Sequence, residues 1–238
     1  MSRKSRAKPP SPFRGFNASP EIIRLVVLMY VRSPLLLRNV EDLLFERGID
    51  VCHETVRFWW NRFGPMFPKA VRRPRVNRMR GFRHWHLDAM FVKINGETHY
   101  LWRAVDHEGE ILESSVTKTR DKQAALAFIK RALKRHGAPA LIVTDGLKSY
   151  RAALCDLGAT AKQEIGRHAN NVVENSHLPL QRRERAMFRF RRIKSLQKFT
   201  SVHANVHNHF LSERHIVDRQ TYKERRSTAL AEWRQIAS

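Results

Sequence analysis

The first part of the chain repeats apolar residues at helical spacing. Between residues 19 and 63, apolar positions recur every three or four residues in three successive segments, which predicts three short amphipathic helices. Ser19 and Pro20 supply an N-cap and a first-turn proline for the first helix, and Gly48 stands where the second should end. A tight turn between the last two helices is typical of a helix-turn-helix, whose last helix enters the major groove of DNA.

The last of these helices has an apolar face and a polar face. Its polar face offers four candidates for contacts in the groove: Thr55, Arg57, Asn61 and Arg62. An ordinary three-helix bundle with a solvated basic face would show the same pattern. The choice between the two depends on the charge of the whole chain.

From residue 84 onward the pattern alternates between apolar and polar positions, which predicts strands. Asn95-Gly96 favours a two-residue hairpin, because both residues tolerate positive φ. The expected strands are 84–94, 98–106, 110–118, 140–144 and 161–164, with helices after Asp121, near 149–157 and from HANNVVENSH onward. Three antiparallel strands, a helix, and a strand parallel to the first form the order of a ribonuclease-H-like fold.

Further along, one residue interrupts the helical pattern. Pro179 predicts that the helix opened by HANNVVENSH breaks, or that a second helix begins there. The next apolar stripe predicts a helix packed on the core: Leu196, Phe199, Val202, Val206 and Phe210. His203 and His207 have the spacing of a zinc pair, but no acidic third ligand accompanies them.

The most unusual feature of the composition is its net charge. The chain holds 45 Lys and Arg against 22 Asp and Glu, a formal net charge of +23. Such a surplus indicates a polyanionic partner, nucleic acid before membrane. No apolar run approaches the ~20 residues of a membrane span. Cys52 and Cys155 lack the spacing of a disulfide framework or zinc finger. We expect an intracellular protein that faces DNA or RNA.

One residue does not fit the first strand. Asp88 stands between Leu87 and Ala89, where a carboxylate is a poor strand former. In the predicted sheet Asp88 can neighbour Asp145, and Glu174 from a helix nearby could complete a group of three. Three such carboxylates would repel one another unless divalent cations neutralised them. Two hard cations ~3.5–4 Å apart are the usual device for phosphodiester chemistry.

Each of these carboxylates also has a purely structural interpretation. Asp88 faces Arg103 across the predicted hairpin and could form a cross-strand ion pair. Asp145 could belong to a strand-terminal turn, and Glu174 could be an ordinary surface residue of a helix. Asp106, at the end of the second strand, is a further carboxylate, which we expect to form a turn. Spacing alone leaves both interpretations open.

Three segments carry a family resemblance. WHLDAMFVKINGETHYLWRAVDHEG, LIVTDGLKSY and HANNVVENSHLPLQRRERAMFRF resemble the small bacterial DDE transposases of insertion sequences, above all the insertion-sequence-six family. The resemblance implies that Asp88, Asp145 and Glu174 are catalytic residues and metal ligands. It implies Mg²⁺ as cofactor, with Mn²⁺ able to substitute. One departure is Gln181, which stands where many members carry Lys or Arg.

The resemblance also implies a reaction and its partners. A transposase of this kind binds the terminal inverted repeats of its element, cleaves the 3′ ends and transfers them into target DNA. The implied partners are double-stranded DNA, as transposon ends and target, and further copies of the chain in a homodimer or higher oligomer. Neither a membrane nor a nucleotide cofactor is expected. The protein would be cytoplasmic in a bacterium and associated with the nucleoid through DNA.

Several further residues are candidates for DNA contacts or accessory roles. The expected phosphate contacts are Arg72, Arg73, Lys148, Arg182 and Arg183, and the possible accessory residues are His86 and His177. The rival hypothesis is a non-catalytic, sequence-specific DNA-binding protein, either a repressor or an inactivated transposase. A ribonuclease for RNA:DNA hybrids would not need the helix-turn-helix.

These observations predict the fold class and domain order. The fold class is α/β, with a ribonuclease-H-like mixed sheet and flanking helices, preceded by an all-α helix-turn-helix domain. The expected divisions are a basic flexible arm at 1–18, the helix-turn-helix domain at 19–63, a basic linker at 64–83, the ribonuclease-H-like catalytic core at 84–212 and a C-terminal helical tail at 213–238.

Overall fold

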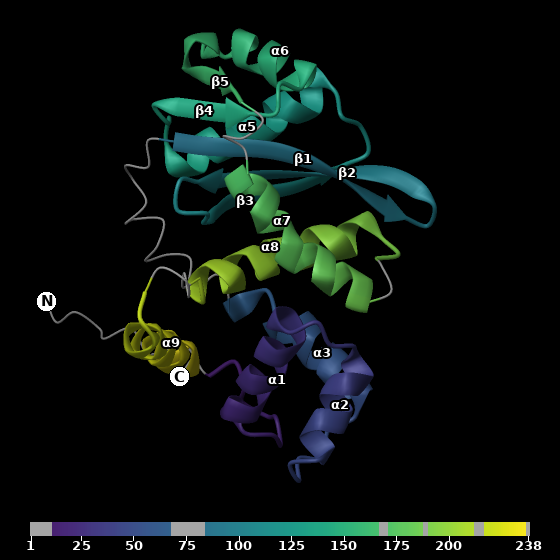
Figure 1. The fold of residues 1–238 in the computed structure, drawn as a ribbon. Helices are drawn as coiled ribbons and strands as arrows, with labels where there is room; N and C mark the ends of the chain where they lie inside the picture. Colours follow the sequence, from purple (N-terminus) through teal and green to yellow (C-terminus); the bar gives the residue numbers. More distant parts are fainter. Residues whose placement is uncertain (1–10, 68–83, 167–170, 188–189, 212–216, 237–238) are drawn as a thin grey trace, which may run out of the picture.

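The computed structural model describes residues 11–67, 84–166, 171–187, 190–211 and 217–236. The elements are stacked in layers (Figure 1). A sheet with α5 and α6 forms the upper part, α7 and α8 lie beneath the sheet, and α1 to α3 lie below them. Helix α9 lies beside α1. No described helix has both the length and the apolar character needed to cross a bilayer.

The three predicted N-terminal helices are present. They are α1 (Pro20–Arg32), α2 (Leu37–Phe45) and α3 (His53–Phe63). Ser19 caps α1 as expected, because its hydroxyl accepts a hydrogen bond from the Ile22 amide at 3.3 Å. Val56, Trp59 and Trp60 are buried on the inner face of α3. The helical spacing of the sequence therefore predicted both the helices and the face that each buries.

The predicted strands form one mixed sheet. They are β1 (His84–Ile94), β2 (Glu97–Asp106), β3 (Ile111–Thr117), β4 (Leu141–Thr144) and β5 (Gln163–Ile165), in the spatial order β3-β2-β1-β4-β5. β1 pairs antiparallel with β2 and parallel with β4. Asn95 and Gly96 close the first hairpin with φ of 50° and 86°. This is the ribonuclease-H-like order, so the predicted fold class is confirmed.

Helices cover both faces of the sheet. The remaining elements are α5 (Lys122–His136), α6 (Lys148–Asp156), the 3₁₀ turn η1 (Thr160–Lys162), α7 (Asn171–Ala186), α8 (Ile193–His209) and α9 (Arg219–Gln235). Trp85, Leu87 and Ala89 of β1 pack with buried residues of α5 and α6. Alternation along the strand turns His86 and Asp88 the other way, toward α7 and α8.

Helix α7 continues through Pro179, so the predicted break there is wrong. Proline has no amide hydrogen to donate to the carbonyl of Asn175, which weakens the helix locally. Contacts on both sides of the proline hold the helix in place. His177 contacts the sheet and Arg183 contacts α1. Tertiary contacts thus maintain a helix that the local pattern alone would end.

The N-terminal helices share one hydrophobic core with the rest of the molecule. That core joins α1, α2 and α3 to the far end of the β1–β2 hairpin, to α7 and α8, and to Trp233 of α9. Trp60 and Phe199 illustrate the junction, with ring centroids 5.6 Å apart. The helix-turn-helix is therefore packed against the core rather than tethered to it.

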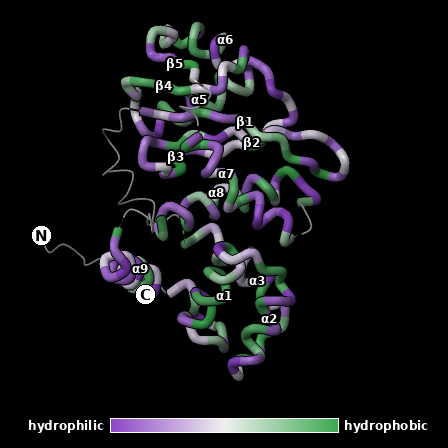
Figure 2. The backbone as a smooth tube through the Cα atoms, viewed as in Figure 1, coloured by the Kyte–Doolittle hydropathy of each residue, from purple (hydrophilic) through white to green (hydrophobic). Residues whose placement is uncertain are grey.

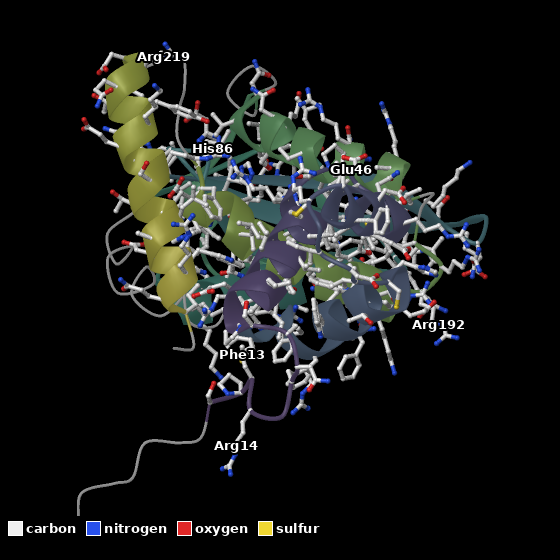
Figure 3. All side chains as sticks on the ribbon, turned by 90° about the horizontal axis from the view of Figure 1, so that it is seen from below. Phe13, Arg14, Glu46, His86, Arg192 and Arg219 are labelled. Carbon is white, nitrogen blue, oxygen red and sulfur yellow. The ribbon has the colours of Figure 1, made fainter. Side chains whose placement is uncertain are left out.

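Two expected domain limits need correction. Phe13 was expected within a flexible arm, but its side chain is 5% exposed and its ring lies 5.0 Å from that of Phe63. Arg14, the next residue, extends away from the body (Figure 3). Phe67, expected in the linker, is also fully buried. Aromatic burial therefore extends the folded region from residue 11 to residue 67, while 1–10 and 68–83 lie outside the described residues.

The C-terminal tail packs through few residues. Helix α9 is mostly hydrophilic along its length (Figure 2), and Trp233 is its buried residue. The Trp233 indole donates to the carbonyl of Arg24 at 3.3 Å, and the Arg24 guanidinium donates to the carbonyl of Ile236 at 2.8 Å. The end of α9 is thus anchored to α1.

Arg183 does not face DNA as expected; its side chain is 1% exposed. Its guanidinium donates two hydrogen bonds to the Tyr30 carbonyl, one of them at 2.9 Å, and lies over the rings of Tyr30 and Phe199. Tyr30 is in the last turn of α1, where carbonyls lack partners within the helix. Arg183 therefore caps α1 from a distant helix, and burial lowers its pKa to about 10.

We expect Arg183→Met to lower the free energy of unfolding by about 2 kcal/mol, because it leaves a buried carbonyl without a donor. Arg182→Met is the matched control, since Arg182 is the exposed neighbour on the same helix. Urea unfolding of the wild type and both variants measures the difference. Equal stability of the two variants would contradict the capping role.

Candidate active site

Two of the predicted carboxylates lie side by side at one edge of the sheet. In the parallel pairing of β1 with β4, Leu87 stands opposite Thr144. Asp88 and Asp145 are the next residue on each strand. The Tyr150 hydroxyl lies within electrostatic range of both carboxylates. Burial raises its pKa well above the usual range, and the negative charges of Asp88 and Asp145 raise it further. The fold thus brings these two carboxylates together.

Asp88 is held by a histidine from the helix beneath the sheet. His177 Nε2 lies 3.0 Å from a carboxylate oxygen of Asp88. Burial alone would raise the pKa of Asp88, but the hydrogen bond from His177, the hydrogen bond from the Ala89 amide and the charge of Arg120 outweigh it and lower the pKa. The side chain of Asp88 remains 16% exposed, so the carboxylate is accessible.

His177 donates the hydrogen bond as a neutral imidazole. Burial is the largest effect on its pKa and lowers it below the ordinary 6.5, and the charge of Arg103 lowers it further. The two interactions with Asp88 act in the opposite direction. A carboxylate only accepts, so Nε2 carries the proton and the pair is fixed in one tautomer at neutral pH.

Arg103 stands opposite Asp88 in the hairpin, as the sequence indicated. It is fully buried, and one guanidinium nitrogen donates to the Ser176 carbonyl of α7. Burial lowers its pKa to about 10, against the influence of Asp88. Within the described part of the chain no ion pair joins Arg103 to Asp88. The cross-strand ion pair is therefore not formed, and Asp88 is turned toward His177 instead.

Asp145 combines a turn with an accessible carboxylate. One oxygen accepts a hydrogen bond from the Leu147 amide at 3.1 Å, as expected of a strand-terminal turn. The other lies 3.3 Å from a guanidinium nitrogen of Arg120. The side chain is 31% exposed. Arg120 also lies over the exposed ring of Phe91, 5.4 Å from its centroid.

Glu174 is not part of this group. It is exposed on α7, three residues before His177, which corresponds to a rise of about 4.5 Å along the helix. The described residues contain no group of three His, Cys, Asp or Glu side chains able to hold a metal ion. Asp88 and Asp145 offer the oxygen ligands that a hard divalent cation prefers. The pair thus fits such a cation, while Glu174 lies one helical turn from the contact with Asp88.

Two other residues near the carboxylates have defined surroundings. Asp106 is fully buried and accepts hydrogen bonds from the amides of Glu108 and Glu110, at 2.9 and 2.8 Å. Its predicted role in a turn is confirmed. His86 is buried on β1 two residues before Asp88, and the alternation of side chains along a strand places both on the same face.

The four candidate residues on α3 differ in exposure and in the contacts that they make within the protein. Arg57, Asn61 and Arg62 are exposed, and Thr55 is half-buried. Arg57 forms an ion pair with Glu54 at 2.9 Å on the same helix. Lys198 of α8 donates to the side chain of Asn61 at 3.0 Å. Of the four, Arg62 is the exposed residue whose side chain makes no hydrogen bond or ion pair with another described residue.

Two of the four remaining phosphate candidates lie in the described part of the chain. Lys148 is exposed at the first residue of α6, three positions after Asp145. Arg182 is exposed on α7. Arg72 and Arg73 lie outside the described residues.

Sequence reasoning missed Arg120 and Tyr150. Arg120 follows β3, which runs in the same direction as β1 and β4, so its loop meets Asp145 at one edge of the sheet. That placement could have been derived from the predicted strand order. Tyr150 belongs to the LIVTDGLKSY motif and lies on the buried face of α6. Its proximity to both carboxylates follows from the packing of α6 and not from the motif.

A family model and a curated relative identify the family to which the chain belongs. A family model described as a DDE domain matches residues 82–213. The transposase for insertion sequence-like element IS431mec of Staphylococcus aureus is 31% identical over 170 residues, 69% of this chain and 75% of its own length. An uncharacterized protein of Methanocaldococcus jannaschii is 30% identical over 192 residues, 80% of this chain and 84% of its own. Among solved structures, the Mos1 transposase catalytic domain aligns at 15% identity and TM-score 0.37, over 72% of this chain and 96% of that one.

In metal-free protein we expect the His177 imidazole to titrate below 6.5, because burial disfavours its charged form. Asp88→Asn should lower the pKa of His177 further, since it removes the negative charge that raises it. A pH titration of the histidine ring signals by NMR measures both effects, with Asp145→Asn as the control that leaves the pair intact. A rise of the His177 pKa in Asp88→Asn would contradict this geometry.

Proposed function

Because the chain belongs to the insertion-sequence-six family of DDE-type transposases, we propose that it binds the terminal inverted repeats of an insertion sequence, cleaves the 3′ ends and transfers them into target DNA. The observation that carries the proposal is the pairing of Asp88 with Asp145 at an accessible edge of the sheet. Asp88 forms no ion pair with the buried Arg103, and Asp145 is only partly neutralised by Arg120, so the two carboxylates retain the negative charge that binds a cation.

In this proposal Asp88 and Asp145 hold Mg²⁺, or Mn²⁺ in its place, and Glu174 supplies the third carboxylate. A divalent cation bound there would activate the attacking oxygen and stabilise the leaving oxygen of the phosphodiester. The Glu174 carboxylate would have to turn from solvent toward the pair. Its place one turn from His177, which already contacts Asp88, supports that short movement.

The neighbouring residues prepare the carboxylates for this role. His177 fixes the orientation of Asp88 by donating from a neutral ring, so it adds no charge that would compete with a cation. Arg120 neutralises part of the charge of Asp145. Tyr150 stays protonated behind both, because ionisation would place a third negative charge in a buried site.

DNA would be bound by two surfaces. The exposed side of α3, with Thr55, Arg57, Asn61 and Arg62, would read the terminal repeat in the major groove. Lys148 and Arg182, with Arg72 and Arg73, would contact backbone phosphates. The net charge of +23 supports a polyanionic partner, and such binding would associate the protein with the bacterial nucleoid.

These surfaces suggest a separate function for each part of the chain. The helix-turn-helix at 19–63 would bind the ends, the core at 84–212 would perform the chemistry, and the tail at 213–238 would serve packing or subunit contacts. Concerted cleavage of two ends would require at least a dimer on DNA.

We expect Asp145→Asn to reduce cleavage and strand transfer on labelled terminal-repeat DNA by about 10²-fold or more, the order produced by losing one transition-state contact. The assay contains Mg²⁺ or Mn²⁺, and binding of the ends should be retained. Asp88→Asn and Glu174→Gln should behave in the same way. Asp156→Asn is the control, because this exposed carboxylate pairs only with Lys122 at the surface.

Binding without cleavage by the wild type, in an assay where an active relative cuts its own ends, would support the rival function. The chain would then be a sequence-specific DNA-binding protein without catalytic activity. Full activity of Glu174→Gln alone would remove that residue from the proposed site and leave the two aspartates in it.

We expect Arg62→Ala to weaken binding to terminal-repeat DNA about tenfold, the loss typical of one base contact. Lys130→Ala removes the same charge from the exposed side of α5 and should bind like the wild type. Fluorescence anisotropy with specific and scrambled duplexes measures both. If the two variants lose affinity equally, α3 does not read the repeat through Arg62.

A further inference from the structure

A pocket lined by basic side chains lies between α1, α7, α8 and α9. Its volume is about 250 Å³. Its wall includes Pro179 of α7 and the polar side chains of Arg32, His203, His207, Tyr222 and Arg226. None of the described lining residues is acidic. Pro179 lines the pocket while His177, two residues earlier on α7, faces Asp88, so the pocket and the carboxylate pair lie on different sides of this helix.

Two arginines that line this pocket have no carboxylate partner among the residues that the structure describes. The guanidinium groups of Arg32 and Arg226 lie 4.5 and 5.8 Å from the centroid of the same ring, Phe210. Burial lowers the pKa of Arg32 to about 10, and the positive charge of Arg226 contributes. Neither arginine forms an ion pair with a carboxylate in the described part of the chain. Arg226 donates only to the Tyr222 hydroxyl, at 3.3 Å.

A buried histidine adds to the same imbalance. His203 is 4% exposed, and its Nδ1 has no hydrogen-bond partner among the described residues. Burial holds its pKa well below 6.5, and His207, Arg103 and Arg183 lower it further. These three neighbours of His203 are all basic residues. The pocket therefore offers hydrogen-bond capacity and positive potential, and among the described residues no carboxylate pairs with its arginines.

We propose that this pocket binds a phosphate group. Buried or half-buried guanidinium groups are unfavourable unless an anion pairs with them, and two that share one ring also repel each other. A phosphate between Arg32 and Arg226 would relieve both effects, because the guanidinium fork matches phosphate oxygens in two parallel hydrogen bonds. The volume is sufficient for one such group.

The phosphate has two sources with the same chemistry: free phosphate in solution or a backbone phosphate of bound DNA. For the second source the inference rests on the proposed DNA binding. The site is separate from the carboxylate pair in either case, and its test does not require cleavage.

The first arm titrates the full-length protein with inorganic phosphate in a calorimeter, at constant ionic strength set with chloride. The wild type should bind, and Arg226→Gln should lose at least tenfold in affinity. Arg225→Gln is the matched control, because Arg225 is the exposed neighbour on the same helix and should bind like the wild type. Phosphate should raise the melting temperature of the wild type and Arg225→Gln but not of Arg226→Gln.

The second arm measures DNA affinity against salt for the same three proteins. If a backbone phosphate occupies the pocket, Arg226→Gln should reduce the slope of log K against log salt by about one, and Arg225→Gln should not. If free phosphate is the ligand, the three slopes should agree while phosphate binding depends on Arg226. The proposal is overturned if the wild type binds no phosphate and the slopes agree, or if the two variants behave alike in both arms.

Discussion

Helix α7 is held at three points, and the arrangement of the molecule depends on them. His177 contacts Asp88, the Ser176 carbonyl accepts from Arg103, and Arg183 caps the end of α1 through Tyr30. The first two contacts attach the helix to the sheet, and the third attaches it to the N-terminal helices. Because one continuous helix makes all three contacts, it connects the carboxylates to the N-terminal helices, and Glu174 is carried on the same helix.

The charges of the interior show a consistent division. Positive groups are buried where they hold elements together, as Arg103 and Arg183 do by donating to backbone carbonyls of neighbouring helices. Burial lowers the pKa of each to about 10, so both remain charged at neutral pH. The buried carboxylate of Asp106 likewise bonds to backbone amides, whereas Asp88 and Asp145 stand at the edge of the sheet, where they reach solvent. In this basic chain, Asp88 and Asp145 are thus accessible to a cation.

Much of the fold was predictable because its signals are local. Alternation in β1, the Asn95-Gly96 turn and the Asp121 cap, which accepts from the Ala124 amide at 2.8 Å, each involve residues close in the chain. Asp88 was recognisable by its conflict with the strand pattern. The strand order then followed from simple connections, and this order alone placed Asp88 beside Asp145.

The sequence by itself determined the elements, the sheet order, the basic charge and the proximity of Asp88 to Asp145. Tertiary structure decided which charged residues are buried. Arg182 and Arg183 are neighbours of the same type, yet one is exposed and the other caps α1, because only the packing of α7 against α1 and α8 separates them. Phe13 and Arg120 likewise acquire their partners, Phe63 and Asp145, from distant parts of the chain. Which of two neighbouring charged residues is buried depends on contacts between distant segments, and no local pattern specifies that choice.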